Sequence, residues 1–163
     1  MPRRMLRNSI VCNLNRMRAA WCCLLVLPTV GCSDGGRPAR SVASAPGVYR
    51  ARGPYSPIVR YGNWRLLSGV LPLEPGGNAL RGANVEEQTR VVLDYIGAEL
   101  RADGLGYRNV LSTTVYLTDL NDFAAMNAAY AKYFEVSPPA RTTVAVSALP
   151  LNAKVEVSVI AAE

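Results

Sequence analysis

The sequence predicts an α+β fold in which two helices cover one face of a mixed sheet, with the element order ββαβαββ. Three observations predict this fold class. The segment 85–100 carries apolar residues at helical spacing, and five short runs are patterned as strands. A double proline at 138–139 separates a second helix from the last two strands. A two-layer domain with one uncovered sheet face is therefore expected.

The first two strands are expected in "SPIVRYGNWRLLSGVLPL", where the Gly-Asn pair at 62–63 supplies a hairpin turn. A loop at 74–83 leads from there into the first helix. Asn84 precedes Glu87 by three residues, which is the spacing of a capping box at a helix start. The apolar side of this helix is expected to consist of Val85, Val92, Leu93, Ile96 and Leu100, and the helix is expected to end at Gly104.

The third strand is expected in "NVLSTTVYLTDL" at 109–120, which alternates in hydrophobicity. Caps at 119–122 then begin the second helix, which the double proline ends. Two further strands follow at about 142–148 and 153–161. The inward face of the third strand should carry Leu111, Thr113, Val115 and Leu117, and the stripe of the second helix Phe123, Met126, Tyr130, Tyr133 and Phe134.

The chain begins with a basic and apolar leader that has the pattern of a secretory signal. Five arginines and no acid occur within 1–31, and the apolar stretch 19–32 is shorter than the roughly 20 residues that span a bilayer. Because this stretch ends in small residues before Cys32, we expect a signal peptide of the lipoprotein type, with Cys32 as the lipidated first residue. The alternative is a disordered basic tail before a buried apolar segment.

This leader sets the expected organisation and location of the protein. Residues 33–54 are rich in Gly, Pro, Ser and Ala, so they are predicted to form a flexible tether, and the folded domain is expected over 55–163. The predicted location is outside the cytoplasm, as a periplasmic protein or a membrane-anchored lipoprotein of a bacterium. Contact with the membrane is expected through the lipid anchor alone.

The residue inventory excludes several kinds of site. The chain has no histidine, and its four cysteines all lie within 12–32, so Cys/His metal sites, Ser/His/Asp triads and Cys/His dyads are excluded. The net charge is +6, but from Cys32 onward there are 13 basic and 12 acidic residues. We therefore expect no disulfide in the domain, no metal or other cofactor, and no nucleic-acid partner.

Two single charges stand in segments that otherwise resemble core. Arg141 follows the double proline, and its forked guanidinium suits a carboxylate, although an ordinary ion pair or a solvated strand edge also explains it. Glu156 lies between Val155 and Val157 and points away from their face. It is either a structural partner for a neighbouring cation or a carboxylate that orients or deprotonates water. The uncovered apolar sheet face predicts a homo-oligomer.

Four spans carry a family resemblance: "PYSPIVRYGNWRLLSG", "YRNVLSTTVYLTDLNDFAAMNAAYAKYF", "PPARTTV" and "LPLNAKVEVSVIA". Together they resemble the YjgF/Rid family of reactive-intermediate deaminases, also called the L-PSP family, over 54–162. The resemblance implies a chorismate-mutase-like fold, assembled as a homotrimer with ligand sites in the clefts between subunits. It also implies a 2-iminobutanoate/2-iminopropanoate deaminase-like hydrolase, which converts reactive 2-imino acids or their enamine tautomers to 2-oxo acids and ammonia.

The resemblance also assigns roles to residues of this chain. It implies Arg141 in "PPAR" as the carboxylate-binding arginine and Glu156 in "KVEV" as the water-orienting glutamate. Many members have a cysteine where this chain has Thr143, whose backbone is expected to line the site. The loop 74–83 also departs from the common form, which leaves the substrate range open. The other substrate-binding residues that the resemblance implies are Tyr55, Ser68 and Asn127.

The expected mechanism needs only positioning and one water, because an imine carbon is already electrophilic. Arg141 would hold the substrate carboxylate and Glu156 the attacking water, and the carbinolamine would then collapse with loss of ammonia. The alternative is a non-catalytic module that binds a small carboxylate or acts as a chaperone on the same fold. Ribonuclease activity is a third interpretation, which the near-neutral charge after Cys32 disfavours.

Overall fold

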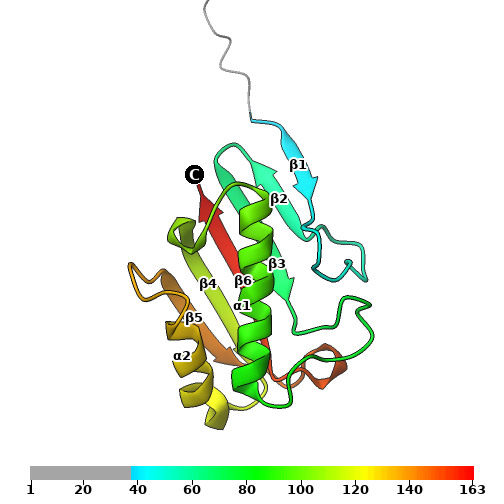
Figure 1. Cartoon of the computed structure of the whole chain (residues 1–163), viewed down its shortest axis with the longest axis vertical. Coiled ribbons are helices and arrows are strands. Elements are labelled where there is room, and N and C mark those ends of the chain that lie inside the picture. Colours follow the sequence, from blue (N-terminus) through cyan, green and yellow to red (C-terminus); the bar gives the residue numbers. More distant parts are fainter. Residues whose placement is uncertain (1–37) are drawn as a thin grey trace, which may run out of the picture. The chain divides into compact units, whose positions relative to one another are not determined.

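The structure of this chain is a computed structural model that describes residues 38–163 (Figure 1). The described part contains one six-stranded sheet with the strand order β1-β2-β3-β6-β4-β5. Strands β4 and β5 pair in parallel and all other neighbours are antiparallel, so the sheet is mixed as predicted. The strands are β1 (Arg40–Ala43), β2 (Ile58–Tyr61), β3 (Trp64–Val70), β4 (Val110–Leu117), β5 (Ala140–Ala145) and β6 (Val155–Ala162).

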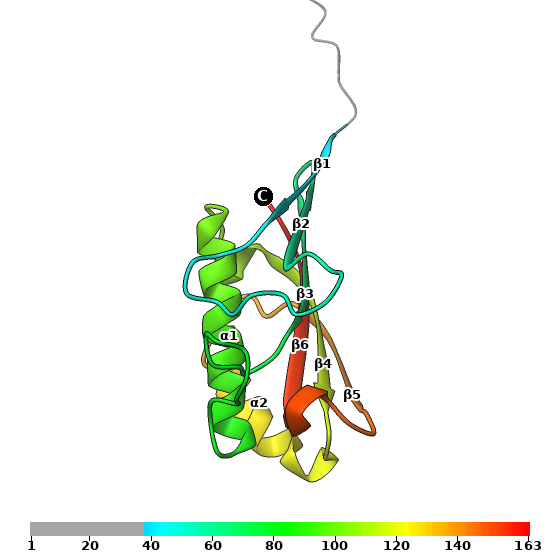
Figure 2. The same cartoon turned by 90° about the vertical axis from the view of Figure 1, so that its right-hand side faces the viewer.

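Two α-helices cover one face of this sheet, which confirms the predicted two-layer fold (Figure 2). Helix α1 (Val85–Ala102) begins at the predicted cap, where Asn84 Oδ1 accepts the Glu87 N–H at 2.9 Å. The Glu87 carboxylate in turn accepts the Ala83 N–H at 2.8 Å. Helix α2 (Phe123–Ala131) follows a short 3₁₀ turn at Leu120–Asp122.

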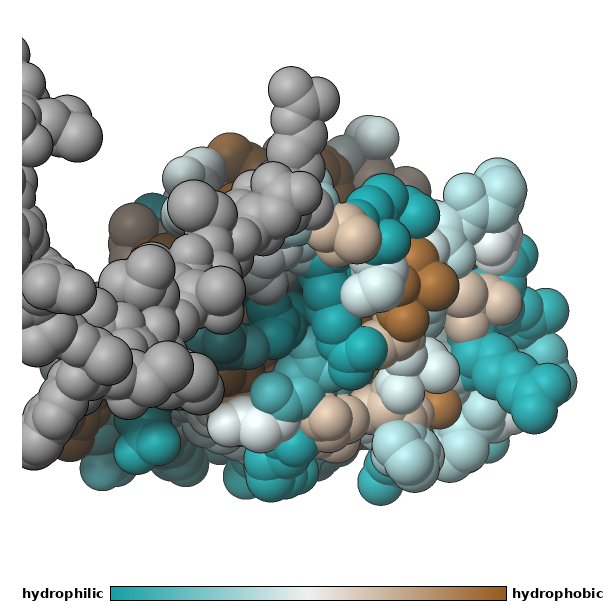
Figure 3. Space-filling view, turned by 90° about the horizontal axis from the view of Figure 1, so that it is seen from above, coloured by the Kyte–Doolittle hydropathy of each residue, from teal (hydrophilic) through white to brown (hydrophobic). Residues whose placement is uncertain are grey.

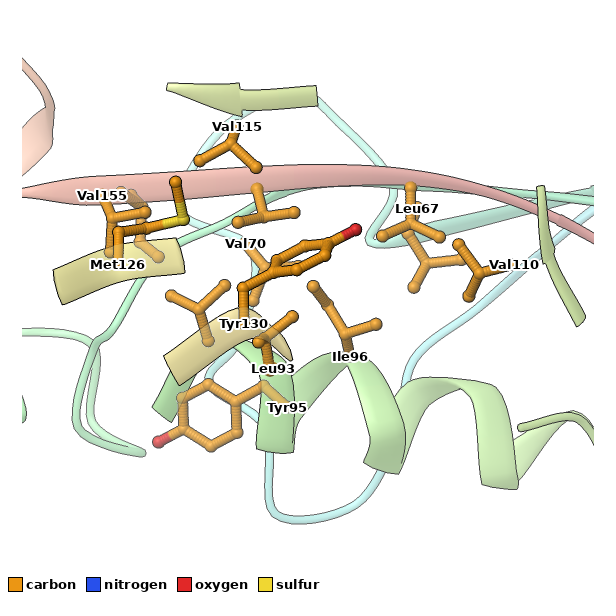
Figure 4. Packing of buried hydrophobic residues seen from close by; sticks show 14 of the residues in the cluster. Leu67, Val70, Leu93, Tyr95, Ile96, Val110, Val115, Met126, Tyr130 and Val155 are labelled. Carbon is orange, nitrogen blue, oxygen red and sulfur yellow. The ribbon is translucent and has the colours of Figure 1, made fainter. Parts of the chain in front are cut away.

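The hydrophobic core lies between the helices and the sheet (Figure 4). Leu93 and Ile96 of α1 are 0% exposed and point toward the strands. Val155, Val157 and Val159 of β6 are also fully buried, so this strand presents alternate residues to the helices. Because Val155 and Val157 face the helices, Glu156 between them points to the opposite, uncovered face.

The folded part begins before the predicted boundary at residue 55. Strand β1 pairs with β2, and the Tyr49 side chain is buried in the core, where its hydroxyl accepts the Leu71 N–H at 2.8 Å. The described residues of the predicted tether, 38–54, are therefore part of the fold. Composition alone cannot distinguish a linker from a segment in which only a few residues pair with a strand or pack in the core. The predicted start of the domain at residue 55 is therefore too late in the chain.

Two other local predictions differ from the structure. Thr113, Val115 and Leu117 of β4 are buried as predicted, but a register shift between Val110 and Ser112 buries Val110 in place of Leu111, which is 47% exposed. A β-bulge reverses the side that a side chain faces, so simple alternation placed Leu111 wrongly. Helix α2 ends at Ala131 and not at the double proline. The next three residues form turns instead, since their N–H groups donate to carbonyls three residues back in the chain.

The uncovered face of the sheet carries large apolar side chains, as the sequence predicted. Seen from above, apolar patches interrupt the polar surface of the described part (Figure 3). The exposed apolar residues whose strand positions face the uncovered side of the sheet include Val42, Tyr61, Trp64, Leu66, Val144 and Ile160.

None of the helices within 38–163 has the length and apolar character needed to cross a membrane.

Candidate functional site

The side chain of Glu156, in β6, lines a cavity of about 240 Å³ on the uncovered side of the sheet. Tyr55 and Ser68 line the same cavity, so three of the predicted site residues lie together. We call this cavity the glutamate pocket; its remaining lining residues are Gly69, Leu71 and Pro150. Burial raises the pKa of the Glu156 carboxyl, and no cation within 38–163 forms an ion pair with it.

A bulge in β3 shapes the wall of the glutamate pocket. The pairing of β3 with β6 shifts between Leu67 and Val70, so Ser68 and Gly69 leave the regular ladder. The Ser68 hydroxyl donates to the Ser56 carbonyl at 2.8 Å, which fixes the side chain at the rim. A Cβ at position 69 would lie 1.8 Å from Glu156 Oε1, so glycine gives this carboxylate its room. Bulges commonly re-aim side chains near functional sites, and this one does so for Ser68.

Arg141 of β5 lies in a different cavity, of about 440 Å³, beside α2. Its Nη2 donates to Asn127 Oδ1 at 2.7 Å, so the predicted Arg141 and Asn127 also lie together. The guanidinium carbon stands 4.6 Å from the centre of the Tyr130 ring and 5.9 Å from that of Phe123. These contacts hold a planar cation over aromatic faces. We call this cavity the arginine pocket; Ala131, Phe134, Pro138 and Pro139 complete its lining.

Within residues 38–163, most of the hydrogen-bond donors of the Arg141 side chain have no protein partner. No carboxylate in the described part of the chain forms an ion pair with Arg141. Asn127 accepts one of the five guanidinium N–H donors. Thr143, two residues further along β5 on the same face, buries its Oγ1 without a hydrogen-bond partner among residues 38–163. The pocket is therefore suited to an anion with planar oxygens.

The two pockets do not meet within one chain. Arg141 faces α2 on the helix side of the sheet, whereas Glu156 faces the uncovered side, and the pockets share no lining residue. Arg141 and Glu156 therefore do not form a salt bridge with each other within residues 38–163 of one chain. No group of three or more His, Cys, Asp or Glu residues that would suit a metal ion occurs within 38–163.

Sequence reasoning missed two residues that shape these pockets. Gly69 leaves space for Glu156, and a glycine within a strand pattern is a known signal of a bulge or a close approach. Tyr130 was placed in the apolar stripe of α2, and it does pack there, with its hydroxyl 2.8 Å from Thr113 Oγ1. Its ring also supports Arg141, which helical periodicity alone does not reveal.

Comparisons with known proteins agree with this architecture. The sequence model of the family described as Endoribonuclease L-PSP matches residues 43–163. "Reactive Intermediate Deaminase A, chloroplastic" from Arabidopsis thaliana is 45% identical over 122 residues, which make up 75% of this chain and 65% of that protein. "2-iminobutanoate/2-iminopropanoate deaminase" from Mus musculus is 38% identical over 124 residues, which make up 76% of this chain and 92% of that protein.

Solved structures match the described fold equally well. The Rid family protein YyfA from Yersinia pestis superposes with a TM-score of 0.73 and 38% identity, over 77% of this chain and all of that one (100%). The structure of E. coli TdcF with bound serine gives a TM-score of 0.71 and 32% identity, over 76% of this chain and 98% of that one.

The prediction of an exported, lipid-anchored protein is wrong. Matching relatives come from Arabidopsis, Pyrococcus horikoshii, Myxococcus xanthus and mouse, and the one compartment that their names print is the chloroplast. These relatives support neither a periplasmic location nor a signal peptide or lipoprotein. Cys32 and the leader 1–31 also lie outside the described residues. A short apolar stretch after arginines has low specificity as the pattern of a signal peptide.

Proposed function

This chain belongs to the Endoribonuclease L-PSP family, the YjgF/Rid proteins, and from this premise we propose that it is a deaminase that hydrolyses reactive 2-imino acids to 2-oxo acids and ammonia. The observation that carries the proposal is a pair of charges, Arg141 and Glu156, each without an ion-pair partner in the described chain and each lining an open cavity. A permanent cation suits the carboxylate of the substrate, and a desolvated carboxylate suits a general base.

The contacts of each pocket support a division of roles. Arg141, held flat by Tyr130 and by Asn127, binds the substrate carboxylate through two parallel hydrogen bonds, with the backbone near Thr143 beside it. Glu156 holds a water against the imine carbon and takes a proton from it as the water adds. The nitrogen gains one proton as the water adds and a second, from Glu156, as the C–N bond breaks and ammonia leaves. The carbinol hydroxyl releases its proton as the C=O bond forms, which balances the first proton taken up by the nitrogen. The hydroxyls of Ser68 and Tyr55 line the other side of the substrate.

Both roles require a second copy of the chain, because the two pockets lie on opposite sides of one sheet. The site therefore forms between copies, with the arginine pocket of one facing the glutamate pocket of the next. The apolar uncovered face supports self-association, since burying it removes large side chains from water. A closed homotrimer is the assembly we expect, and sedimentation of the chain as a monodisperse monomer at micromolar concentration would contradict it.

Two other functions are compatible with the same fold. A non-catalytic protein that binds a small carboxylate would use the arginine pocket and leave Glu156 without a role, although its pKa is raised by burial. A ribonuclease, as the family description prints, needs a surface for phosphates. Residues 38–163 contain 12 basic and 11 acidic residues, and five of the basic ones are within ion-pair distance of acids. The deaminase fits the unpaired charges better.

Ammonia release from an imine tests the proposal. An amino-acid oxidase generates the 2-imino acid in situ, and the decay of the imine is followed with and without the purified chain, with small aliphatic substrates first. We expect decay faster than in buffer and saturation with substrate. Unchanged decay together with saturable binding of a 2-oxo acid would favour the non-catalytic protein.

A further inference from the structure

Glu99 is a carboxylic acid in the position of a core residue. It lies in α1 one turn after Ile96 and Tyr95, is 2% exposed, and has no hydrogen-bond partner for its Oε2 within the described part of the chain. Burying an unpaired carboxylate is strongly unfavourable, and a buried polar atom without a partner requires an explanation. The deaminase mechanism above makes no use of Glu99.

A small internal cavity separates Glu99 from the candidate site. Its volume of about 10 Å³ is room for a single water molecule. Three residues with hydroxyl groups line it together with Glu99, namely Tyr49, Tyr55 and Ser68. The Tyr49 oxygen accepts the Leu71 N–H, which leaves its own proton to donate. The Ser68 hydroxyl donates to Ser56, which leaves its lone pairs to accept. One water here therefore has the polar partners that internal waters need.

The wall of this cavity is also the wall of the glutamate pocket. Tyr55, Ser68 and Gly69 line both, so the bulge of β3 has Glu99 on one side and Glu156 on the other. A route of hydroxyls thus connects the buried acid to the cavity in which the substrate is expected.

We propose that Glu99 is a neutral carboxylic acid that acts as a positioning residue, exchanging a proton with the substrate nitrogen through one internal water and the Ser68 hydroxyl. This inference rests on the proposed deaminase function. For this transfer the Ser68 hydroxyl turns from the Ser56 carbonyl, to which it donates in the structure, toward the imine nitrogen. Ser68 gives its proton to that nitrogen, a proton of the water replaces it, and the proton of Glu99 passes to the water. Glu156 takes a proton from the attacking water, whose oxygen bonds to the imine carbon.

The protons return when the carbinolamine collapses. Glu156 gives its proton to the nitrogen, the C–N bond breaks, and ammonia leaves. The proton of the carbinol hydroxyl travels back through Ser68 and the water to Glu99 as the C=O bond forms. Imine and water have then become 2-oxo acid and ammonia, and both glutamates are restored.

The surroundings of Glu99 keep its proton in place near neutral pH. Burial raises the pKa of Glu99 to about 8, so the acid form dominates at pH 7 and is lost as the pH rises through that value. The ionisable groups that face it from other segments are Tyr49 and Tyr55, with Glu156 beyond the wall. One turn further along α1, Asp103 is already paired with Arg60 and Arg65.

The full-length variants Glu99→Gln and Glu99→Leu test this role, with Glu86→Gln at the exposed start of α1 as the matched control. We expect both Glu99 variants to fold with an undiminished Tm, because each removes a buried acid. Their kcat should fall about 10-fold or more, with KM nearly unchanged. The wild type should lose kcat as the pH rises through about 8, and this alkaline limb should be absent from Glu99→Gln.

Infrared spectroscopy gives a readout that does not depend on activity. A protonated carboxyl band should be present at pH 7, disappear on titration above pH 8, and be missing from Glu99→Gln but not from Glu86→Gln. If that band is absent at pH 7, or if both Glu99 variants keep the kcat and pH profile of the wild type, the inference is overturned while the deaminase proposal stands. A wild type that does not hydrolyse imines would overturn the deaminase proposal and the proton route together.

Discussion

The arginine pocket and the glutamate pocket are built by different means. Side chains build the first: Asn127 and Tyr130 of one short helix hold the guanidinium of Arg141 in place. Backbone builds the second, where a bulge and the missing side chain of Gly69 make room for Glu156. A charge fixed by side chains is suited to binding, whereas a charge that burial deprives of solvent is suited to proton transfer.

The largest expected effect comes from removing the base. Glu156→Gln keeps the shape of the side chain but removes its ability to accept a proton, so kcat should fall about 10²- to 10⁴-fold. KM and the Tm should change little, because the binding charge lies in the other pocket. Steady-state kinetics and thermal melts measure both quantities. A Glu156→Gln variant that is fully active, or one that loses its fold instead of its activity, would contradict the role of the glutamate pocket in proton transfer.

Mixing two inactive variants tests whether the pockets complete each other across copies. Arg141→Ala and Glu156→Gln chains are unfolded together and refolded as mixed assemblies. If each site takes one pocket from each of two neighbouring copies, about one quarter of the sites regain both residues, and activity should return to about that fraction. If one chain supplied both residues, no mixed site would be intact. Ammonia release before and after mixing decides between the two arrangements.

Much of the fold was predictable because it follows local rules. The cap at Asn84, the hairpin turn at 62–63 and the buried alternation of β6 all appear where pattern predicted them. Strand β1 was missed because its four residues have no pattern of their own and depend on pairing with β2. Leu111 was placed on the wrong face because a bulge is a property of the paired strands.

The identity of the candidate site residues was predictable from the sequence, but their positions relative to one another were not. Arg141 and Glu156 stood out in sequence because each is a single charge in an apolar run. That they lie on opposite sides of the sheet follows from pairing and from the place of α2, which no local pattern contains. Glu99 was not singled out, since one acid on a helix is ordinary until its burial is known.

A smaller effect is expected at the arginine pocket. Arg141→Lys keeps the charge but loses the fork that makes two parallel hydrogen bonds. One charged hydrogen bond contributes about 1.5–3 kcal/mol, so KM should rise roughly 10- to 100-fold while kcat at saturation changes less. Arg108→Lys, at an exposed arginine of a 3₁₀ turn, is the matched control. Unchanged KM in a folded Arg141→Lys assembly would contradict the carboxylate-binding role.

Gly69→Ala perturbs the glutamate pocket without removing its charge. The new Cβ would overlap Glu156 Oε1, which is the flexible end of a side chain, so the carboxylate should rotate away at little expense in Tm. A displaced base should lower kcat about 10-fold and leave KM unaffected. Gly106→Ala adds a Cβ that meets nothing within 4 Å and is the control. A larger loss of Tm than of kcat would mean that Gly69 serves the fold and not the base.

The smallest expected effect is a shift to higher pH of the acidic limb of kcat/KM. This shift should distinguish the two pockets, because only the glutamate pocket contains the group that causes it. Burial raises the pKa of Glu156, so its carboxylate gains a proton at a higher pH than an ordinary glutamate does. The base form is needed, and kcat/KM should therefore fall as the pH drops through that raised pKa. The arginine pocket contains no carboxylate among its lining residues, so the binding of a 2-oxo acid should not follow the same limb. Rates of imine decay against pH, compared with oxo-acid titrations on the same samples, give both curves. If affinity and rate fell together along one limb, Glu156 would act in binding, and the division between a binding pocket and a proton-transfer pocket would no longer hold.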